Sequence, residues 1–113
     1  MHQLPKPAIR AHGFSGERHF VAPPDVVRAA ARHALLRDLC VTAAGHFPQA
    51  AGHLVSRPAG VPDEIVILCV QGSGWCRFGG RHWRIRAGDL VRVPPRMAHA
   101  YGTTKRQPWS IYW

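Results

Sequence analysis

Short apolar segments separated by glycine and proline recur along the C-terminal two thirds of the chain. The strongest of them, EIVILCV (64–70), is rich in β-branched residues and apolar at successive positions, so we predict a central strand buried on both faces. The QGSG segment that follows it (71–74) predicts a tight hairpin turn, and Gly79-Gly80 is typical of a second, two-residue hairpin. In total the sequence predicts about eight short strands at even spacing. This pattern favours an antiparallel sandwich or a small barrel.

The N-terminal third has a different pattern. Residues 1–20 carry proline, glycine and histidine without a clear period, and we predict an arm or loop there, with residues 21–113 forming the domain itself. Prolines at the start, Asp25 in the first turn and a run rich in Ala and Leu predict a helix from Pro24 to Leu39. Its apolar residues recur at helical spacing, so one side is expected to pack against the domain.

Length and hydrophobicity are those of an ordinary single-domain globular protein. The chain has 113 residues, of which 46% are hydrophobic, and this is enough for one modest core. No apolar run approaches the ~20 residues that a membrane-spanning helix needs. The first residues lack the apolar core of a secretory signal. We therefore expect a cytoplasmic protein without membrane contact.

Arginine dominates the charge. Fifteen Lys and Arg against six Asp and Glu give a net charge of +9, and only Lys6 and Lys105 are lysines. Such an excess is compatible with a nucleic-acid surface, and it is also typical of a solvated basic exterior. Net charge alone does not identify residues that would contact a DNA groove or a base, so both interpretations stay open. The candidates for a nucleic-acid surface are Arg77, Arg81, Arg84, Arg86 and Arg92.

The segment GDLVRVPPRMAHAYG (88–102) resembles the second metal-binding motif of the cupin proteins. Gly88, Pro94 and His99 match that motif, whereas Arg96 stands where the cupins usually have glycine. A cupin metal site also needs two histidines and a glutamate from a first motif, so the match supplies only part of a site.

The other ligands of a cupin metal site are missing. Ile65 stands at the glutamate position, and the segment AGV (59–61) stands where the histidines would be. A single imidazole does not hold a transition metal in a protein, so we expect no metal at His99. The alternative is a stand-alone metal-dependent cupin enzyme, of isomerase or dioxygenase type, with a mixed site of His99, Cys69 and Cys76. The two cysteines would face each other across the predicted hairpin, although buried cysteine more often behaves as a small hydrophobic residue.

Four fragments, taken together, point to one branch of the cupins. SRPAG (56–60), ILCVQGSGWCRFGGR (67–81), the 88–102 segment and PWSIYW (108–113) occur in this order. The chain thereby resembles, from about Gly13 to its end, the N-terminal ligand-binding domain of AraC-type transcription regulators. The resemblance implies an all-β fold: a small antiparallel cupin-like barrel, of double-stranded β-helix or jelly-roll type, with one N-terminal helix. It also implies a sensor rather than an enzyme, in which a small, sugar-like effector binds non-covalently inside the barrel.

The resemblance assigns ligand-binding roles to five residues. The family's arginine falls on Arg57, whose guanidinium offers a donor fork for two hydroxyls or a carboxylate; an exposed strand-end charge is the alternative. His99 and Tyr101 share one face of a strand and would both line the cavity, unless His99 is bonded to the backbone as a structural residue. Trp113 matches a tryptophan on which a sugar stacks, although it could equally be plain core. Ile111 replaces a polar contact of the arabinose-responsive member, which favours a more apolar or smaller effector.

The same resemblance sets the expected partners. No cofactor is implied, and the expected ligand is a small-molecule effector. DNA would be engaged only by a C-terminal helix-turn-helix domain, which lies, with the dimerising helices, beyond the segment ending at Trp113. A homodimer is therefore one expectation for the longer protein. In some members the N-terminal arm folds over the bound effector, and the sequence leaves open whether residues 1–20 do so here.

Overall fold

The computed structural model describes residues 9–113 and contains one helix and nine strands in that range. In chain order they are β1 (Arg18–Val21), α1 (Pro24–Ala31), β2 (Ala43–Phe47), β3 (Leu54–Arg57), β4 (Ile65–Gln71), β5 (Ser73–Phe78), β6 (Arg81–Arg86), β7 (Leu90–Val93), β8 (His99–Thr103) and β9 (Ser110–Tyr112). Within these residues no helix has the length and apolar character needed to cross a membrane.

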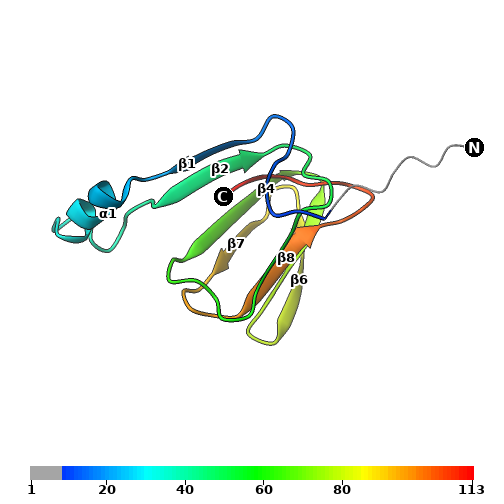
Figure 1. Ribbon diagram of the computed structural model, residues 1–113. Helices are drawn as coiled ribbons and strands as arrows, with labels where there is room; N and C mark the ends of the chain where they lie inside the picture. Colours follow the sequence, from blue (N-terminus) through cyan, green and yellow to red (C-terminus); the bar gives the residue numbers. More distant parts are fainter. Residues whose placement is uncertain (1–8) are drawn as a thin grey trace, which may run out of the picture.

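The strands form two sheets with a shared core (Figure 1). One sheet has the order β1-β2-β9-β4-β7 and the other β3-β8-β5-β6. Neighbouring strands pair antiparallel throughout both sheets. The predicted all-β antiparallel architecture with one N-terminal helix is confirmed.

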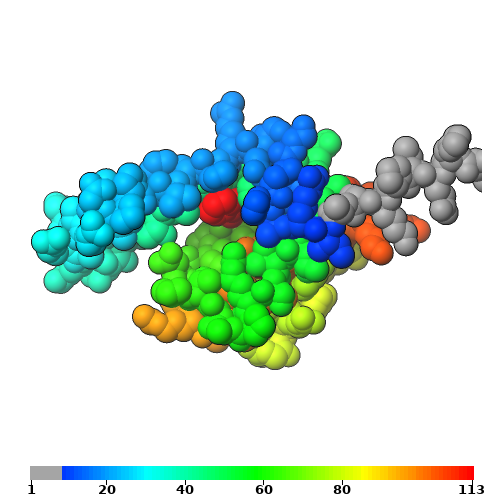
Figure 2. Space-filling view, in the orientation of Figure 1, coloured from blue at the N-terminus to red at the C-terminus, as the bar shows by residue number. Residues whose placement is uncertain are grey.

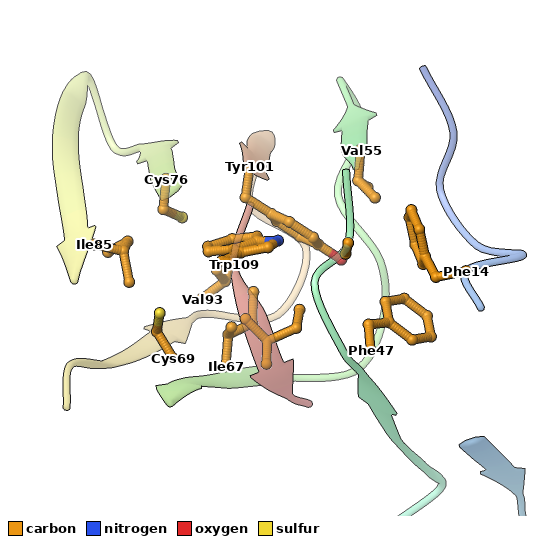
Figure 3. Close-up of a cluster of buried hydrophobic side chains, with 12 residues drawn as sticks. Phe14, Phe47, Val55, Ile67, Cys69, Cys76, Ile85, Val93, Tyr101 and Trp109 are labelled. Atoms are coloured by element: carbon orange, nitrogen blue, oxygen red, sulfur yellow. The ribbon is translucent and has the colours of Figure 1, made fainter. Parts of the chain in front are cut away.

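Side chains from both sheets fill the space between them (Figure 3). Trp109 is fully buried at the centre of this cluster, and Ile67, Val93 and Ile111 are at most 1% exposed. A Cβ atom on Gly74 would collide with the Trp109 ring, so β5 needs glycine at this position. The core thus depends on one large indole that both sheets enclose.

The predicted hairpin at QGSG (71–74) is wrong. β4 and β5 belong to different sheets, and the chain crosses between them at Gly72. Gly72 has a φ of 71°, and a Cβ there would overlap the backbone of Pro108, so only glycine permits this crossing. The hairpin at Gly79-Gly80 is confirmed: both glycines have positive φ and connect the paired strands β5 and β6.

β4 is an interior strand, but it is buried on one face only. It lies between β9 and β7. Ile67 and Cys69 point into the core, whereas Val66 and Val70 are each 44% exposed. The prediction of burial on both faces is wrong, because no described element covers Val66 and Val70 on the outer face of the five-stranded sheet.

The helix is shorter than predicted and lies away from the barrel, beyond the β1–β2 pair (Figure 1). It ends at Ala31 rather than Leu39, and turns follow. The His33 Nδ1 atom accepts the N–H of Leu35 at 3.1 Å, and this side-chain bond competes with helical hydrogen bonding. Only Ala30 of the predicted apolar face is buried. A short helix without packing has little to extend it, which explains the early end.

The segment predicted as an arm contributes to the five-stranded sheet. Arg18–Val21 form β1 and pair with β2, so the expected boundary between residues 20 and 21 falls inside a strand. Further upstream, the backbone of Arg10 bonds to that of Gly52 and Leu54. Residues 1–8 of the predicted arm lie outside the described residues, and the division into arm and domain stays a prediction.

Arg96 provides a test of backbone strain. It has a φ of 58°, in the left-handed region, at the position where the resemblance places glycine. A non-glycine residue there costs about 1–2 kcal/mol, partly offset by the greater unfolded-state freedom of glycine. We expect Arg96→Gly to raise the free energy of unfolding by up to ~1 kcal/mol, measured by urea denaturation.

Gly88→Ala is the matched control for that prediction. Gly88 has a φ of 95°, and a Cβ there would meet nothing within 4 Å, so only backbone strain changes. The free energy of unfolding of this variant should be lower than that of the wild type by about 1 kcal/mol or more. A destabilised Arg96→Gly protein would contradict the strain argument and assign a stabilising role to the Arg96 side chain.

Candidate functional site

A pocket of about 330 Å³ lies between the N-terminal segment and the inner faces of the two sheets. In the space-filling view, the C-terminal residues, in red, are visible between the blue N-terminal strand and the green strands (Figure 2). The pocket is mostly apolar and holds one arginine. Its lining residues are Ala11, His12, His19, Phe47, His53, Val55, Arg57, Tyr101, Ile111 and Trp113.

A larger hollow of about 620 Å³ lies elsewhere on the surface. Its lining consists of glutamines, small residues and a proline, without an aromatic or charged side chain: Gln49, Gln71, Gly72, Ala87, Gln107 and Pro108. The smaller pocket has the aromatic walls and convergent polar groups typical of ligand sites, so we take it as the candidate site.

The register of β3 and β8 brings the polar residues of the pocket together. Arg57 lies directly opposite His99, and Val55 lies opposite Tyr101. Because side chains alternate along a strand, all four point to the inner face of the four-stranded sheet. A shift of β3 by one residue along β8 would turn Val55 and Arg57 outward.

Arg57 is held by two neighbours on β8. Its Nη1 atom lies 3.1 Å from the Nε2 atom of His99 and donates to the Tyr101 hydroxyl at 3.1 Å. The His99 Nδ1 atom lies 2.9 Å from the carbonyl oxygen of Met97. Since a guanidinium only donates, His99 Nε2 must accept, and Nδ1 carries the proton that bonds to Met97. His99 and Tyr101 stack with ring planes 2° apart.

His53 joins the pocket to the core. Its Nδ1 atom accepts the indole N–H of Trp109 at 3.0 Å. Burial, together with the positive charge of Arg57, lowers the pKa of His53 from 6.5 to about 4. The ring is therefore neutral at pH 7, with its proton on Nε2. Phe47 and Tyr101 both meet this ring edge-on.

Trp113 closes the pocket from the end of β9. Its backbone exchanges two hydrogen bonds with Gly45, and the indole lies where a Cβ of Gly45 would be. The ring packs against Phe47 at 5.6 Å between centroids. Its Nε1 atom is buried and has no hydrogen-bond partner among the described residues. A buried N–H of this kind is rare and calls for an explanation.

The structure brings four of the five predicted site residues into one pocket. Arg57, Tyr101, Ile111 and Trp113 line it, whereas His99 lies behind Arg57 and bonds to it. Whether these residues bind a ligand stays a prediction.

Sequence reasoning missed several lining residues. His53 and Val55 share the parity of Arg57 along β3, so alternation offered a signal for both. Ala11, His12 and His19 carry no local signal, because only the fold of the N-terminal segment brings them to the pocket.

The proposed mixed metal site is not assembled in the part of the chain that the structure describes. No three His, Cys, Asp or Glu side chains within residues 9–113 lie close enough together to hold a metal ion. Cys69 and Cys76 lie on different sheets, not across a hairpin. Burial raises the pKa of Cys76 to about 11 and also raises that of Cys69, so both thiols stay protonated and act as small core residues.

The arginines named as candidates for nucleic-acid binding lie outside the pocket. Arg77, Arg81, Arg84 and Arg86 are exposed on the β5–β6 pair. Arg92, on β7, is paired with Glu64, the residue that precedes β4. They therefore form a basic exterior, separate from the site described above.

Comparisons with known proteins indicate one family. A model of the AraC-like ligand binding domain matches residues 41–113. The chain is 38% identical over 95 residues to the MmsAB operon regulatory protein of Pseudomonas aeruginosa, covering 80% of this chain and 31% of that protein. It is 34% identical over 68 residues to the arabinose operon regulatory protein of Escherichia coli, covering 58% of this chain and 22% of that protein. The chain thus spans about a third or less of these relatives.

A solved structure shows the same fold. A cupin-like protein from Thermotoga maritima superposes with a TM-score of 0.50 at 18% identity, covering 62% of this chain and 51% of that one. This likeness confirms the cupin-like barrel.

The lowered pKa of His53 predicts a pH-dependent stability. Between pH 6.5 and about 4 the unfolded chain binds a proton at His53 that the folded chain does not. Stability is therefore complete above this window and falls as the pH falls through it, by on the order of 3 kcal/mol at most. Urea denaturation at pH 7 and at about pH 4.5 measures the loss.

His53→Asn is the variant that isolates this effect. Its side-chain oxygen can still accept from Trp109, but it does not titrate, so the loss of stability on acidification should shrink. His33→Asn, at an exposed histidine, should keep the wild-type pH dependence. An unchanged pH dependence in His53→Asn would assign the acid sensitivity to other groups.

Proposed function

Since the chain belongs to the AraC-like ligand-binding domain family, we propose that its pocket receives a small effector, of about the size of a sugar, and binds it non-covalently. The observation that carries this proposal is the Arg57–Tyr101 pair inside an apolar pocket. Arg57 is fixed by His99 and Tyr101 before any ligand arrives, so little side-chain entropy is lost on binding.

A sensor suits the pocket better than an enzyme. Catalysis needs a nucleophile or base with an orienting partner, and the described lining has no carboxylate, cysteine or serine. Its one buried histidine, His53, already has its Nδ1 atom engaged by Trp109. The relatives are regulators of operons by name, which supports regulation rather than catalysis.

The wider regulatory role is also proposed. Because this chain spans about a third or less of its relatives, DNA binding would come from a further domain of the longer protein. Effector binding would change how that domain engages DNA, and a homodimer would present two such domains. The cytoplasm is where such a regulator would act.

Two substitutions test the pocket. An effector would first be found by screening small metabolites against this chain with ligand-detected NMR. Arg57→Ala should then weaken its binding by about 10- to 100-fold, because a charge-assisted hydrogen bond is lost. Tyr101→Phe should weaken it by about 3- to 10-fold, measured by calorimetry.

Arg84→Ala is the matched control. Arg84 is exposed on β6, outside the pocket, so its loss should leave effector affinity unchanged. Thermal melting would confirm that all three variants fold. Wild-type affinity in both pocket variants would show that the effector binds elsewhere.

A further inference from the structure

Building on the function proposed above, we propose that the pocket takes a small carboxylic acid, a sugar acid included, rather than a neutral sugar. The donors and acceptors that the pocket leaves unused lead to this ligand class.

The hydrogen-bond acceptors behind the pocket are already occupied. His99 Nε2 and the Tyr101 oxygen both accept from Arg57. His53 Nδ1 accepts from Trp109. Each of these bonds fixes a direction, because guanidinium and indole groups only donate. The inner wall therefore keeps no side-chain acceptor for a ligand hydroxyl.

The donors, by contrast, are left over. Arg57 uses only its Nη1 atom in the described hydrogen bonds, so Nε and Nη2 remain. The Tyr101 hydroxyl accepts from Arg57 and keeps its own proton to donate. The Nε2–H of the neutral His53 has no described acceptor, and the Trp113 Nε1–H is buried without one. Four of the side chains that line the cavity thus carry unused donors.

Among residues 9–113, no acidic or amide side chain lines the cavity to balance these donors. All six acidic residues lie in the described part of the chain, and the ion pairs there are Arg37–Asp38 and Arg92–Glu64. Arg57 therefore brings a positive charge into the pocket without a carboxylate partner. The remaining lining acceptors are the rings of His12 and His19, both exposed at the rim.

At the Arg57 guanidinium, a carboxylate satisfies this arrangement and a neutral hydroxyl does not. Each sugar hydroxyl must donate as well as accept, and a buried hydroxyl proton without an acceptor costs about 1–3 kcal/mol. A carboxylate only accepts, matches the guanidinium fork in two bonds, and neutralises its charge. The apolar side chains of Phe47 and Val55, labelled in Figure 3, and that of Ile111 suit an apolar body attached to the carboxylate.

The experiment compares acids with uncharged partners of the same skeleton. The probes are benzoate and benzamide, pivalate and pivalamide, and galacturonate and galactose, titrated into the 113-residue chain at pH 7 and followed by the NMR signals of the Arg57 Nε–H and Trp113 Nε1–H groups. We expect each acid to bind at least about 10-fold more tightly than its partner. Both signals should move with the acids.

Substitutions test which residues give the preference for acids. Arg57→Gln should abolish the preference for acids over their neutral partners, and Arg57→Lys should keep part of this preference. Trp113→Phe keeps an aromatic ring but removes the N–H, so it should weaken the binding of the acids by about 3- to 10-fold. Arg84→Gln, on the outer face, should keep the wild-type preference. Because the readout is a ratio of two affinities, a modest change in stability does not mimic it.

The outcomes separate this inference from the proposed function. Neutral partners that bind as tightly as their acids, or acids that leave both signals unmoved, overturn the carboxylate assignment. In either case an effector from the metabolite screen that depends on Tyr101 would leave the proposed function standing. If no molecule from that screen binds the pocket, the proposed function itself fails.

Discussion

The indole N–H of Trp109 sets the constraint on which the rest of the structure depends. The ring is fully buried between the two sheets, where an unpaired N–H would cost about 1–3 kcal/mol. His53 supplies the acceptor, and it does so only while its Nδ1 is unprotonated. The same bond that completes the core orders the His53 ring and directs its remaining proton away from Trp109, while burial and the charge of Arg57 keep the ring neutral. Core packing and the chemistry of the pocket meet in this one contact.

A second constraint is the register of β3 on β8, which sets the charge of the pocket. It places Arg57 opposite His99, whose own tautomer is fixed by the carbonyl of Met97. The guanidinium is thereby held at the edge of an apolar cavity without a neighbouring carboxylate. An unpaired charge at the edge of an apolar cavity is costly unless a ligand or water forms hydrogen bonds with it. The histidine that resembles a metal ligand has become a support for the arginine.

The N-terminal segment completes the site from outside the barrel. Phe14 is buried against Phe47 and His53, and Arg10 bonds to the backbone before β3. This segment therefore contributes residues to both the core and the pocket lining.

The sequence by itself determined the features that depend on interactions between residues close together in the chain. Alternation placed His99 with Tyr101, the two adjacent glycines marked a real hairpin, and the order of the fragments indicated the family. The tertiary structure alone decided that the chain changes sheets at Gly72, that α1 ends early, and that His53 belongs to the site. Side-chain parity and turn chemistry act over a few residues and can be read along the chain. Sheet membership and the pocket depend on contacts such as that between His53 and Trp109, which are 56 positions apart and meet only when the two sheets close around the core.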